Sequence, residues 1–341
     1  MWYQEDVKKR TKIITIPKYI VRKSIFYFLS FWFILFLDFL IPHLMPGNPV
    51  DAVIGTLSQT RALTSQQISS IESSLGYTKG PIFVEFANYV HNIFTGNFGI
   101  SLQYYPRTAW SIVSQSLSWT IILFGLALVI SFIIGNSLGL ASAHKRGGLR
   151  DGVTSIISIF LYSFPYFWMA LIFLYLFSIR NHIFPEAGAF NLQFTFLSAP
   201  FFISVLTHII LPLGTLIIAS YGSWYLGMRN NTITTLNEDY LKYAEIAGLR
   251  KSTMISYSKK NAILPNLTGF ALSLGNIISG GILVEMVFSY PGLGFDIYNA
   301  VINEDFPVLE LAFFLIILSV LAANFVMDLL YYKLDPRIRE S

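Results

Sequence analysis

Six apolar segments, each close to the length that a helix needs to cross a lipid bilayer, constrain the fold of this chain most strongly. Inside a bilayer the backbone must satisfy its own hydrogen bonds, and an α-helix does so within a single segment. We therefore predict an all-α integral membrane protein with six transmembrane helices. The predicted spans are residues 24–41, 118–141, 152–179, 208–228, 267–288 and 308–331.

The composition agrees with a membrane protein. Hydrophobic residues make up 54% of the 341-residue chain and charged residues only 12%, about half the charged share of an average soluble domain. The chain contains no cysteine. Disulfides, thiolate zinc sites and iron–sulfur clusters are therefore excluded within it.

The distribution of lysine and arginine predicts the orientation of the spans. Of 23 such residues, 7 lie in residues 1–23, 3 in 144–151, 6 in 229–266 and 3 in the C-terminal tail. The other 4 lie in the intervening loops, and none lies inside a predicted span. The positive-inside rule places both termini in the cytoplasm. The net charge of +4 thus serves topology, and we expect no nucleic-acid partner.

The division of the chain follows from these spans. Pro165 is expected inside one continuous third span, because neighbouring helices can satisfy the carbonyl that it frees. Residues 180–206 are expected as an external loop, and residues 108–115 as a surface helix. We expect a cytoplasmic N-terminal segment at 1–23, a first span at 24–41, an external segment at 42–117, a five-helix core at 118–332 with a cytoplasmic loop at 229–266, and a cytoplasmic tail at 333–341.

The loop from Asn237 to Pro265 is a polar island between two spans. Asn237 is predicted to cap a short helix that carries acidic residues in its first turn, and Gly248 to close that helix in the left-handed conformation. An apolar and aromatic stripe with small residues runs along this helix. It suits either a helix lying on the bilayer or a helix that inserts into a soluble partner. The stripe is formed by Tyr240, Tyr243, Ala244 and Ala247.

No catalytic or metal-binding constellation is present in the sequence. The five histidines lie far apart, and the metalloprotease, serine hydrolase and phosphate-binding loop motifs are all missing. We therefore expect a non-catalytic chain without a metal site. Any nucleotide that drives its work would be bound by another subunit.

Acidic residues within or beside the predicted spans are candidates for function. Asp328 is expected to form an ion pair near the cytoplasmic end, with Lys333 or a basic loop, and Glu310 to be solvated at the outer mouth. Glu285 either bonds another helix or faces a polar solute path. The fifth span is rich in small and polar residues, which suit helix packing or an aqueous path equally. The candidate path residues are Asn276, Ser279, Gly280 and Glu285.

Five short motifs in order make the chain resemble the dipeptide/oligopeptide-type permease subunits of binding-protein-dependent ABC importers. The resemblance covers nearly the whole chain, with Asn48 where the family commonly has Asp and Lys242 where its loop motif has Glu. The motifs are Pro-Gly-Asn-Pro at 46–49, Gly-Ile-Ser-Leu at 99–102, the loop from Ala244 through Gly248 to Leu264 and Pro265, Val-Glu-Met-Val-Phe at 284–288 followed by Pro-Gly-Leu-Gly at 291–294, and Leu-Asp-Pro-Arg at 334–337.

The resemblance implies a type I ABC importer permease fold in the plasma or inner membrane. It implies a heterodimer with a second homologous permease, two cytoplasmic ATPases that bind ATP and magnesium, and an external solute-binding protein. This chain itself would hold no cofactor. The residues expected to couple it to an ATPase are Glu238, Tyr240, Tyr243, Ala244, Ala247, Gly248, Leu249 and Pro265, and those expected in an external turn are Pro291, Gly292, Leu293 and Gly294.

The solute is not specified by these motifs, because relatives of this type carry peptides, oligosaccharides or nickel. The external segments 50–116 and 289–307 are expected to receive the binding protein. A stand-alone secondary transporter or channel is the alternative interpretation, and an intramembrane enzyme is a more distant one. Uptake by the single purified chain under an ion gradient would distinguish the secondary transporter, while an intramembrane enzyme needs paired catalytic residues at one depth.

Overall fold

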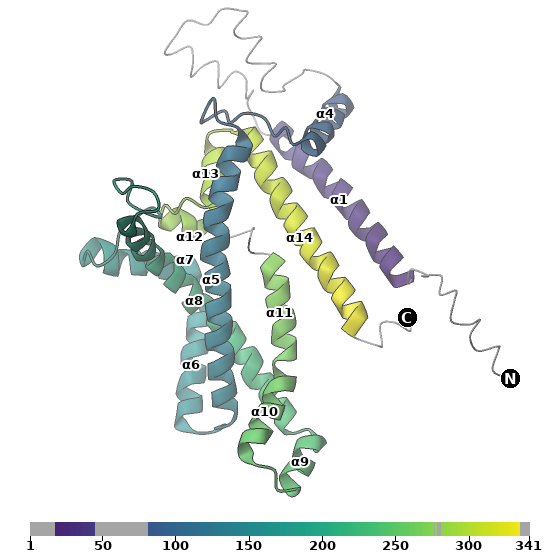
Figure 1. Ribbon diagram of the computed structural model, residues 1–341, viewed down its shortest axis with the longest axis vertical. Coiled ribbons are helices and arrows are strands. Elements are labelled where there is room, and N and C mark those ends of the chain that lie inside the picture. The colour runs from purple at the N-terminus through teal and green to yellow at the C-terminus, as the bar shows by residue number, and fades with distance from the viewer. Residues whose placement is uncertain (1–17, 45–80, 276, 278–280, 335–341) are drawn as a thin grey trace, which may run out of the picture.

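The computed structural model describes residues 18–44, 81–275, 277 and 281–334, and within them the chain is helical apart from loops and one isolated bridge between Ile100 and Thr108 (Figure 1). The all-α class is confirmed. The helices are α1 (Lys18–Leu44), α4 (Ile82–Thr95), α5 (Ala109–Ala143), α6 (Leu149–Ser163), α7 (Tyr166–Phe173), the π-helix η1 (Leu174–Arg180), α8 (Ala199–Leu236), α9 (Asp239–Ile246), α10 (Lys251–Ala262), α11 (Leu264–Gly275), α12 (Ile282–Val287), α13 (Leu293–Ile302) and α14 (Phe306–Leu334).

Four of the described helices, α1, α5, α8 and α14, are long and apolar enough to cross a bilayer. The chain turns through 95° between α6 and the α7–η1 segment. The two therefore count as a fifth crossing only if they form one broken span. The prediction of a continuous third span was therefore wrong. Phe164 and Pro165 adopt extended backbone angles, and a proline ring disfavours helical geometry in the residue before it.

The predicted fifth span, 267–288, is also not one helix. α11 ends at Gly275 and α12 begins at Ile282. Three of the candidate path residues, Asn276, Ser279 and Gly280, lie outside the described residues.

Two long helices begin earlier than predicted. α5 starts at Ala109, so the expected surface helix at 108–115 is the first part of the second span. α8 starts at Ala199, inside the predicted external loop. Each begins after a hydroxyl residue that caps it: the side chain of Thr108 accepts from Ser111 N–H at 3.2 Å, and that of Ser198 from Phe201 N–H at 3.3 Å.

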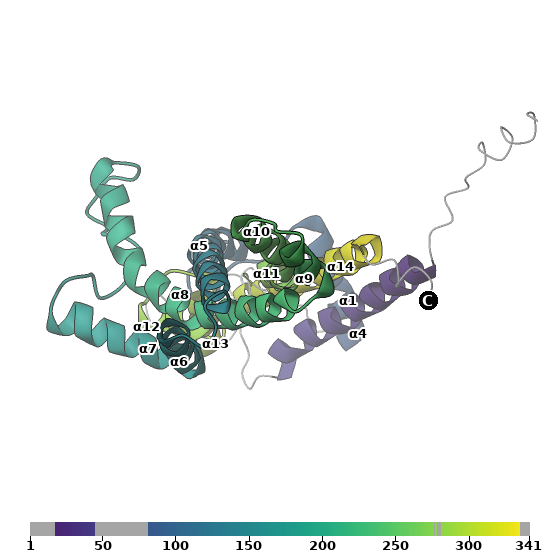
Figure 2. The same ribbon diagram turned by 90° about the horizontal axis from the view of Figure 1, so that it is seen from below.

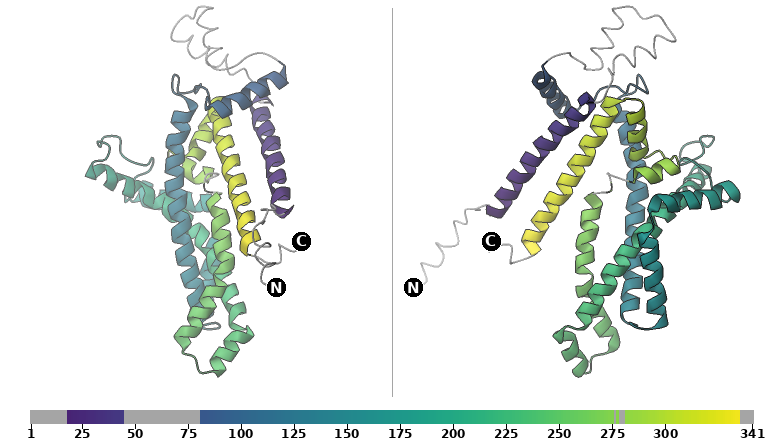
Figure 3. Two further views of the ribbon diagram at one scale, coloured as in Figure 1. Left: turned by 45° about the vertical axis from the view of Figure 1, so that its right-hand side comes forward. Right: turned by 180° about the vertical axis from the view of Figure 1, so that it is seen from behind.

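The long helices connect two ends of the molecule, each of which carries shorter helices or turns. α9, α10 and the turn between α5 and α6 gather at one end, called here the α9 end, while α4 and α13 lie at the other, the α4 end (Figure 1). α1 and α14 pack against each other at one side of the molecule, and α7 with the first part of α8 projects from another (Figures 2 and 3).

Two apolar cores hold these helices together. One joins the start of α5 to α13 and α14, and the other joins the middle of α5 to α7, α8 and α12. The first contains Ala109, Ile112, Val113, Leu293, Ile297, Ala300, Val308, Leu309, Leu311 and Ala312. The second contains Leu123, Ala127, Ala170, Ala189, Ile209, Leu211, Leu216, Val284, Phe288 and Tyr290.

Candidate functional site

The polar loop between α8 and α11 folds as two short helices, α9 and α10, at the tip of the molecule. Asn237 does not cap α9. It closes α8, because its backbone is helical and its N–H donates to the Thr234 carbonyl at 3.1 Å. Glu238 is extended and takes the N-cap position instead, although its side chain makes no capping hydrogen bond. The sequence prediction placed the start of this helix one residue too early.

Gly248 closes α9 in the way the sequence predicts. Its φ angle is +75°, in the left-handed region, and a Cβ atom there would meet no heavy atom within 4 Å. The Leu249 N–H donates to the Ala244 carbonyl at 3.1 Å, and the Gly248 N–H to the Glu245 carbonyl at 2.9 Å. These two bonds form a Schellman motif. The backbone angle alone, rather than crowding, explains the glycine.

One side chain fixes α9 to the rest of the protein, and the opposite face is open. Leu241 is only 1% exposed. Tyr243 and Ile246 are 71% and 83% exposed, and Tyr240, whose hydroxyl accepts from the Asn261 amide of α10, is also exposed. Ala247 belongs to this open face as well. The predicted stripe is therefore a solvent-facing apolar surface, and the sequence did not reveal Leu241 as its anchor.

A charged network lies directly behind this loop. Arg229 of α8 makes two bonds to Asp151 of α6, with Nε to Oδ1 at 2.7 Å and Nη2 to Oδ2 at 2.8 Å. The hydroxyl of Ser142 at the end of α5 also donates to Asp151. The Tyr225 hydroxyl lies 2.7 Å from the Ser142 hydroxyl and 2.8 Å from that of Ser155. The network joins α5, α6 and α8, and no local sequence motif predicts it.

Close backbone contacts hold α5 and α8 together beside this network. A Cβ atom at Gly139 would lie 2.5 Å from the Tyr225 carbonyl oxygen, and one at Gly135 would lie 2.5 Å from the Tyr221 carbonyl oxygen. Such contacts require residues without a side chain. α5 and α8 are therefore tightly packed against each other where these glycines lie.

Three further hydrogen bonds connect α10 and α11 to these helices. Asn266 of α11 donates to the Asn136 side chain at 2.7 Å and to the Trp224 carbonyl at 3.0 Å. The Ser258 hydroxyl of α10 lies 3.3 Å from His144 Nε2 at the end of α5. We call these joined parts of α5, α6, α8, α10 and α11 the anchor block. Pro265 lies in the first turn of α11, where proline is tolerated.

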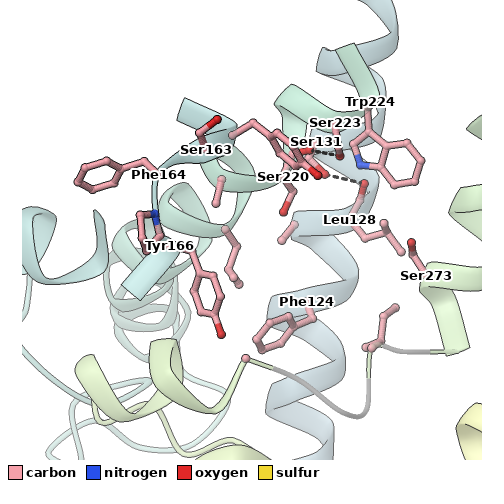
Figure 4. Close-up of a pocket in the computed structure, with 17 residues that line it drawn as sticks. Phe124, Leu128, Ser131, Ser163, Phe164, Tyr166, Ser220, Ser223, Trp224 and Ser273 are labelled. Carbon is pink, nitrogen blue, oxygen red and sulfur yellow. Dashed lines mark hydrogen bonds between the residues drawn. The ribbon is translucent and has the colours of Figure 1, made fainter. Parts of the chain in front are cut away.

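A cavity of about 570 Å³ opens between α5, the α6–α7 bend, α8 and α11 (Figure 4). Both breaks in the predicted spans border it: Phe164 and Pro165 from the bend, and Ile277 and Gly281 from the gap between α11 and α12. The remaining lining residues are Phe124, Ala127, Leu128, Ser131, Tyr162, Ser163, Tyr166, Leu216, Ala219, Ser220, Ser223, Trp224 and Ser273.

Glu285 does not line this cavity. Its side chain is fully buried and accepts from the Thr120 hydroxyl at 2.7 Å and from the Phe295 N–H at 3.1 Å. Thr120 in turn accepts from the Leu293 N–H at 2.7 Å. Of the two roles left open by the sequence, the geometry supports a bond that ties α5 to α12 and α13.

The turn at 291–294 packs closely against the rest of the protein. Gly292, Leu293 and Gly294 are buried, and only Pro291 is partly open. A Cβ atom at Gly294 would lie 2.8 Å from a Glu285 carboxylate oxygen. The glycines thus let the turn close over Glu285, and the turn holds α13 in place.

Two other acidic residues of the long helices, Asp328 and Asp38, have structural partners. Asp328 pairs with Lys23 of α1 at 2.8 Å and accepts from the Tyr27 hydroxyl at 2.8 Å. The expected ion pair is thus present, with a partner that sequence proximity could not suggest. Asp38 accepts from the Tyr89 hydroxyl of α4 at 2.8 Å. Among the described residues, no three His, Asp or Glu side chains gather as a metal site would require.

Comparison with known proteins places these features in a family. The family model for the binding-protein-dependent transport system inner membrane component matches residues 135–340, which include the anchor block, the α9–α10 loop and most of the cavity. The chain belongs to this family. It is therefore a multi-pass membrane permease component of an ABC transport system, which agrees with the resemblance found in the sequence.

Relatives of this permease match over nearly their full length. A Brucella ovis protein named as a peptide permease is 32% identical over 304 residues, 89% of this chain and 93% of its own. The di/tripeptide transport system permease protein DppB of Pseudomonas aeruginosa is 31% identical over 330 residues, 92% and 96% of the two chains. The dipeptide transport system permease protein DppB of Escherichia coli K12 is 28% identical over 327 residues, 89% and 94%.

Proposed function

We propose that this permease forms half of the translocation pathway of an ABC importer for a peptide or oligosaccharide-like solute that an external binding protein delivers. The names of its relatives favour a peptide. The observation that carries the proposal is the open apolar face of α9, which the anchor block connects to the helices around the cavity. The apolar face of α9, which an ATPase would pull, is thus linked to the helices that line the cavity.

The coupling step follows from this connection. α9 sits in a cleft of a cytoplasmic ATPase, with Tyr240, Tyr243 and Ala247 against the partner, and Glu238, Ala244, Gly248, Leu249 and Pro265 shape the loop. When the ATPases close on nucleotide, α9 is drawn with them. The anchor block transmits this movement because its helices share buried hydrogen bonds and glycine contacts. The cavity then changes its opening from one side of the membrane to the other.

The assembly in this proposal has a second homologous permease, two ATPases that hold ATP and magnesium, and the binding protein on the outside. Both termini of this chain and the α9 end face the cytoplasm, as the distribution of basic residues indicates. The binding protein meets the α4 end. This chain contributes no catalytic residue.

The substitution Gly248→Val tests the coupling role, and Gly96→Val is its matched control. Both glycines have nearly the same positive φ, +75° and +74°, and a Cβ atom at either meets nothing within 4 Å. The backbone strain is therefore equal, but Gly96 ends α4 at the opposite end of the molecule. We expect Gly248→Val, but not Gly96→Val, to lose co-purification of the ATPases. Normal ATPase capture by the inserted Gly248→Val chain would refute the proposal.

A further inference from the structure

We propose that the cavity contacts the solute in transit through neutral groups alone, so that this chain makes no selection for solute charge. Hydroxyl groups of the wall would meet the amide groups of a peptide backbone, and aromatic rings would meet its side chains. This inference rests on the proposed function and adds the chemistry of the contact. Charge selection in the transporter then belongs to other subunits.

The position of the cavity supports its use as a solute site. α5 contributes residues 124–131 and α8 contributes residues 216–224, which lie in the middle third of each long helix. Interrupted helices at membrane depth are tolerated where the irregular backbone is buried or lines an aqueous cavity. In transporters, interrupted spans also mark solute sites near the bilayer midplane. Here the bend at Pro165 and the end of the α11–α12 gap at Gly281 meet at one cavity.

The lining chemistry is polar but uncharged. Five serines, two tyrosines and one tryptophan supply hydrogen-bonding groups among the described lining residues, and none of those residues is acidic, basic or histidine. Residues 276 and 278–280, which the structure does not describe, are Asn, Ile, Ser and Gly in the sequence, and none of them is charged. A charged group entering this cavity meets no opposite charge from the described lining residues.

The serine hydroxyls keep acceptor capacity for a solute. Ser223 and Ser273 are both partly exposed, and each donates to a carbonyl of its own helix, at 2.8 and 2.9 Å. A hydroxyl has two acceptor lone pairs besides its one proton. Trp224 adds an N–H donor, and the tyrosine hydroxyls can donate or accept a hydrogen bond. Figure 4 shows these groups around one space, where both halves of an amide group find partners.

Aromatic rings complete the wall. Phe124, Phe164, Tyr166 and Trp224 come from three different elements and are drawn around the same cavity in Figure 4. Rings offer area for side chains of many shapes without requiring a particular hydrogen bond. The wall thus suits a set of peptides, which share the same backbone chemistry but differ in their side chains.

Placing a charge in the wall tests the inference. In the assembled transporter with its own binding protein, the measurement is the ratio of Ala-Lys-Ala uptake to Ala-Glu-Ala uptake. Ser273→Asp, at a partly exposed lining serine, is expected to raise this ratio roughly tenfold or more, because a carboxylate in a partly dehydrated cavity attracts one solute and repels the other. The control, Ser118→Asp, adds the same charge to α5 outside the cavity and should leave the ratio unchanged. Ser223→Asp serves as a second cavity variant.

The outcomes separate this inference from the proposed function. Equal ratios for the cavity variants and the control overturn the inference while leaving peptide transport intact. Uptake of neither peptide by the wild type refutes the proposed function for peptides. The cavity can still be tested then, because the chain has no cysteine. Cationic and anionic thiol reagents should modify Ser223→Cys, at a partly exposed lining position, at rates within about threefold, corrected for free cysteine, and a preference of about tenfold for either overturns a neutral wall.

Discussion

The Arg229–Asp151 pair gives the sharpest prediction about how movement reaches the membrane helices. Arg229 lies on α8 shortly before that helix leads into α9, and Asp151 lies in the first turn of α6. Their side chains are 20% and 5% exposed. Replacing the arginine by methionine keeps most of the side-chain volume but removes both bonds. A buried carboxylate is then left with neutral donors only.

The size of the effect follows from this geometry. Removing one partner of a buried ion pair costs about 3–5 kcal/mol, because the other charge stays buried without compensation. Asp151 keeps the Ser142 hydroxyl and the Gly147 N–H at 3.1 Å, so we expect the lower end, about 3 kcal/mol. That is about a hundredfold in the equilibrium between joined and separated α6 and α8.

Two assays follow the prediction in the assembled transporter. The midpoint of thermal unfolding should fall in Arg229→Met. ATP hydrolysis should persist, because α9 is intact, while uptake per ATP hydrolysed should drop. The double variant with Asp151→Leu should recover much of the thermal stability, since an apolar pair of similar volume often replaces a buried ion pair without loss.

A comparison variant separates this role from general damage. Asp151→Asn leaves the arginine unpaired, but Arg229 is partly open to water, so its loss of stability should be smaller than in Arg229→Met. Unchanged unfolding and unchanged uptake per ATP in Arg229→Met would refute the idea that this pair transmits the movement of α9.

Three further predictions concern other parts of the fold. Gly139→Val should prevent accumulation of folded protein, because its Cβ would lie 2.5 Å from the Tyr225 carbonyl oxygen, whereas Gly125→Ala on the same helix meets nothing within 4 Å and should be silent by fluorescence-detected size exclusion. Leu241→Ala should cost about 2–5 kcal/mol locally and make α9 protease-sensitive. Burial raises the pKa of Asp296 to about 6, above its unfolded value, so unfolding free energy should fall by roughly 2–3 kcal/mol between about pH 4 and pH 6, and Asp296→Asn should remove this slope.

The sequence predicts those features of the fold that local chemistry decides. Apolar runs of sufficient length specify helices, because a bilayer leaves the backbone no other partner. Gly248 is recognisable because a glycine after a short amphipathic helix is the usual way to end it. In both cases the information lies within a few turns of chain.

Features that depend on distant residues could not be predicted in this way. A proline within an apolar run is compatible with a slight kink or with a full turn, and contacts elsewhere decide that Pro165 marks a bend of 95°. Leu241 looks like any other apolar residue until the body of the protein covers it. Asp151 and Arg229 lie 78 positions apart, and only the packing of α6 against α8 brings them together.

The placement of rigid and interrupted parts limits where this permease can bend. At the α9 end, one ion pair, hydrogen bonds of side-chain amides and hydroxyls, and glycine contacts join five helices, so deformation there would break several buried interactions at once. At the cavity, α6 has already separated from α7, and α11 from α12. Beyond it, Glu285 and Thr120 tie α12 and α13 to α5. A movement that enters through α9 therefore meets its least resistance at the Pro165 bend, which borders the cavity. The solute site and the hinge of the transporter are, on this reasoning, the same region of the chain.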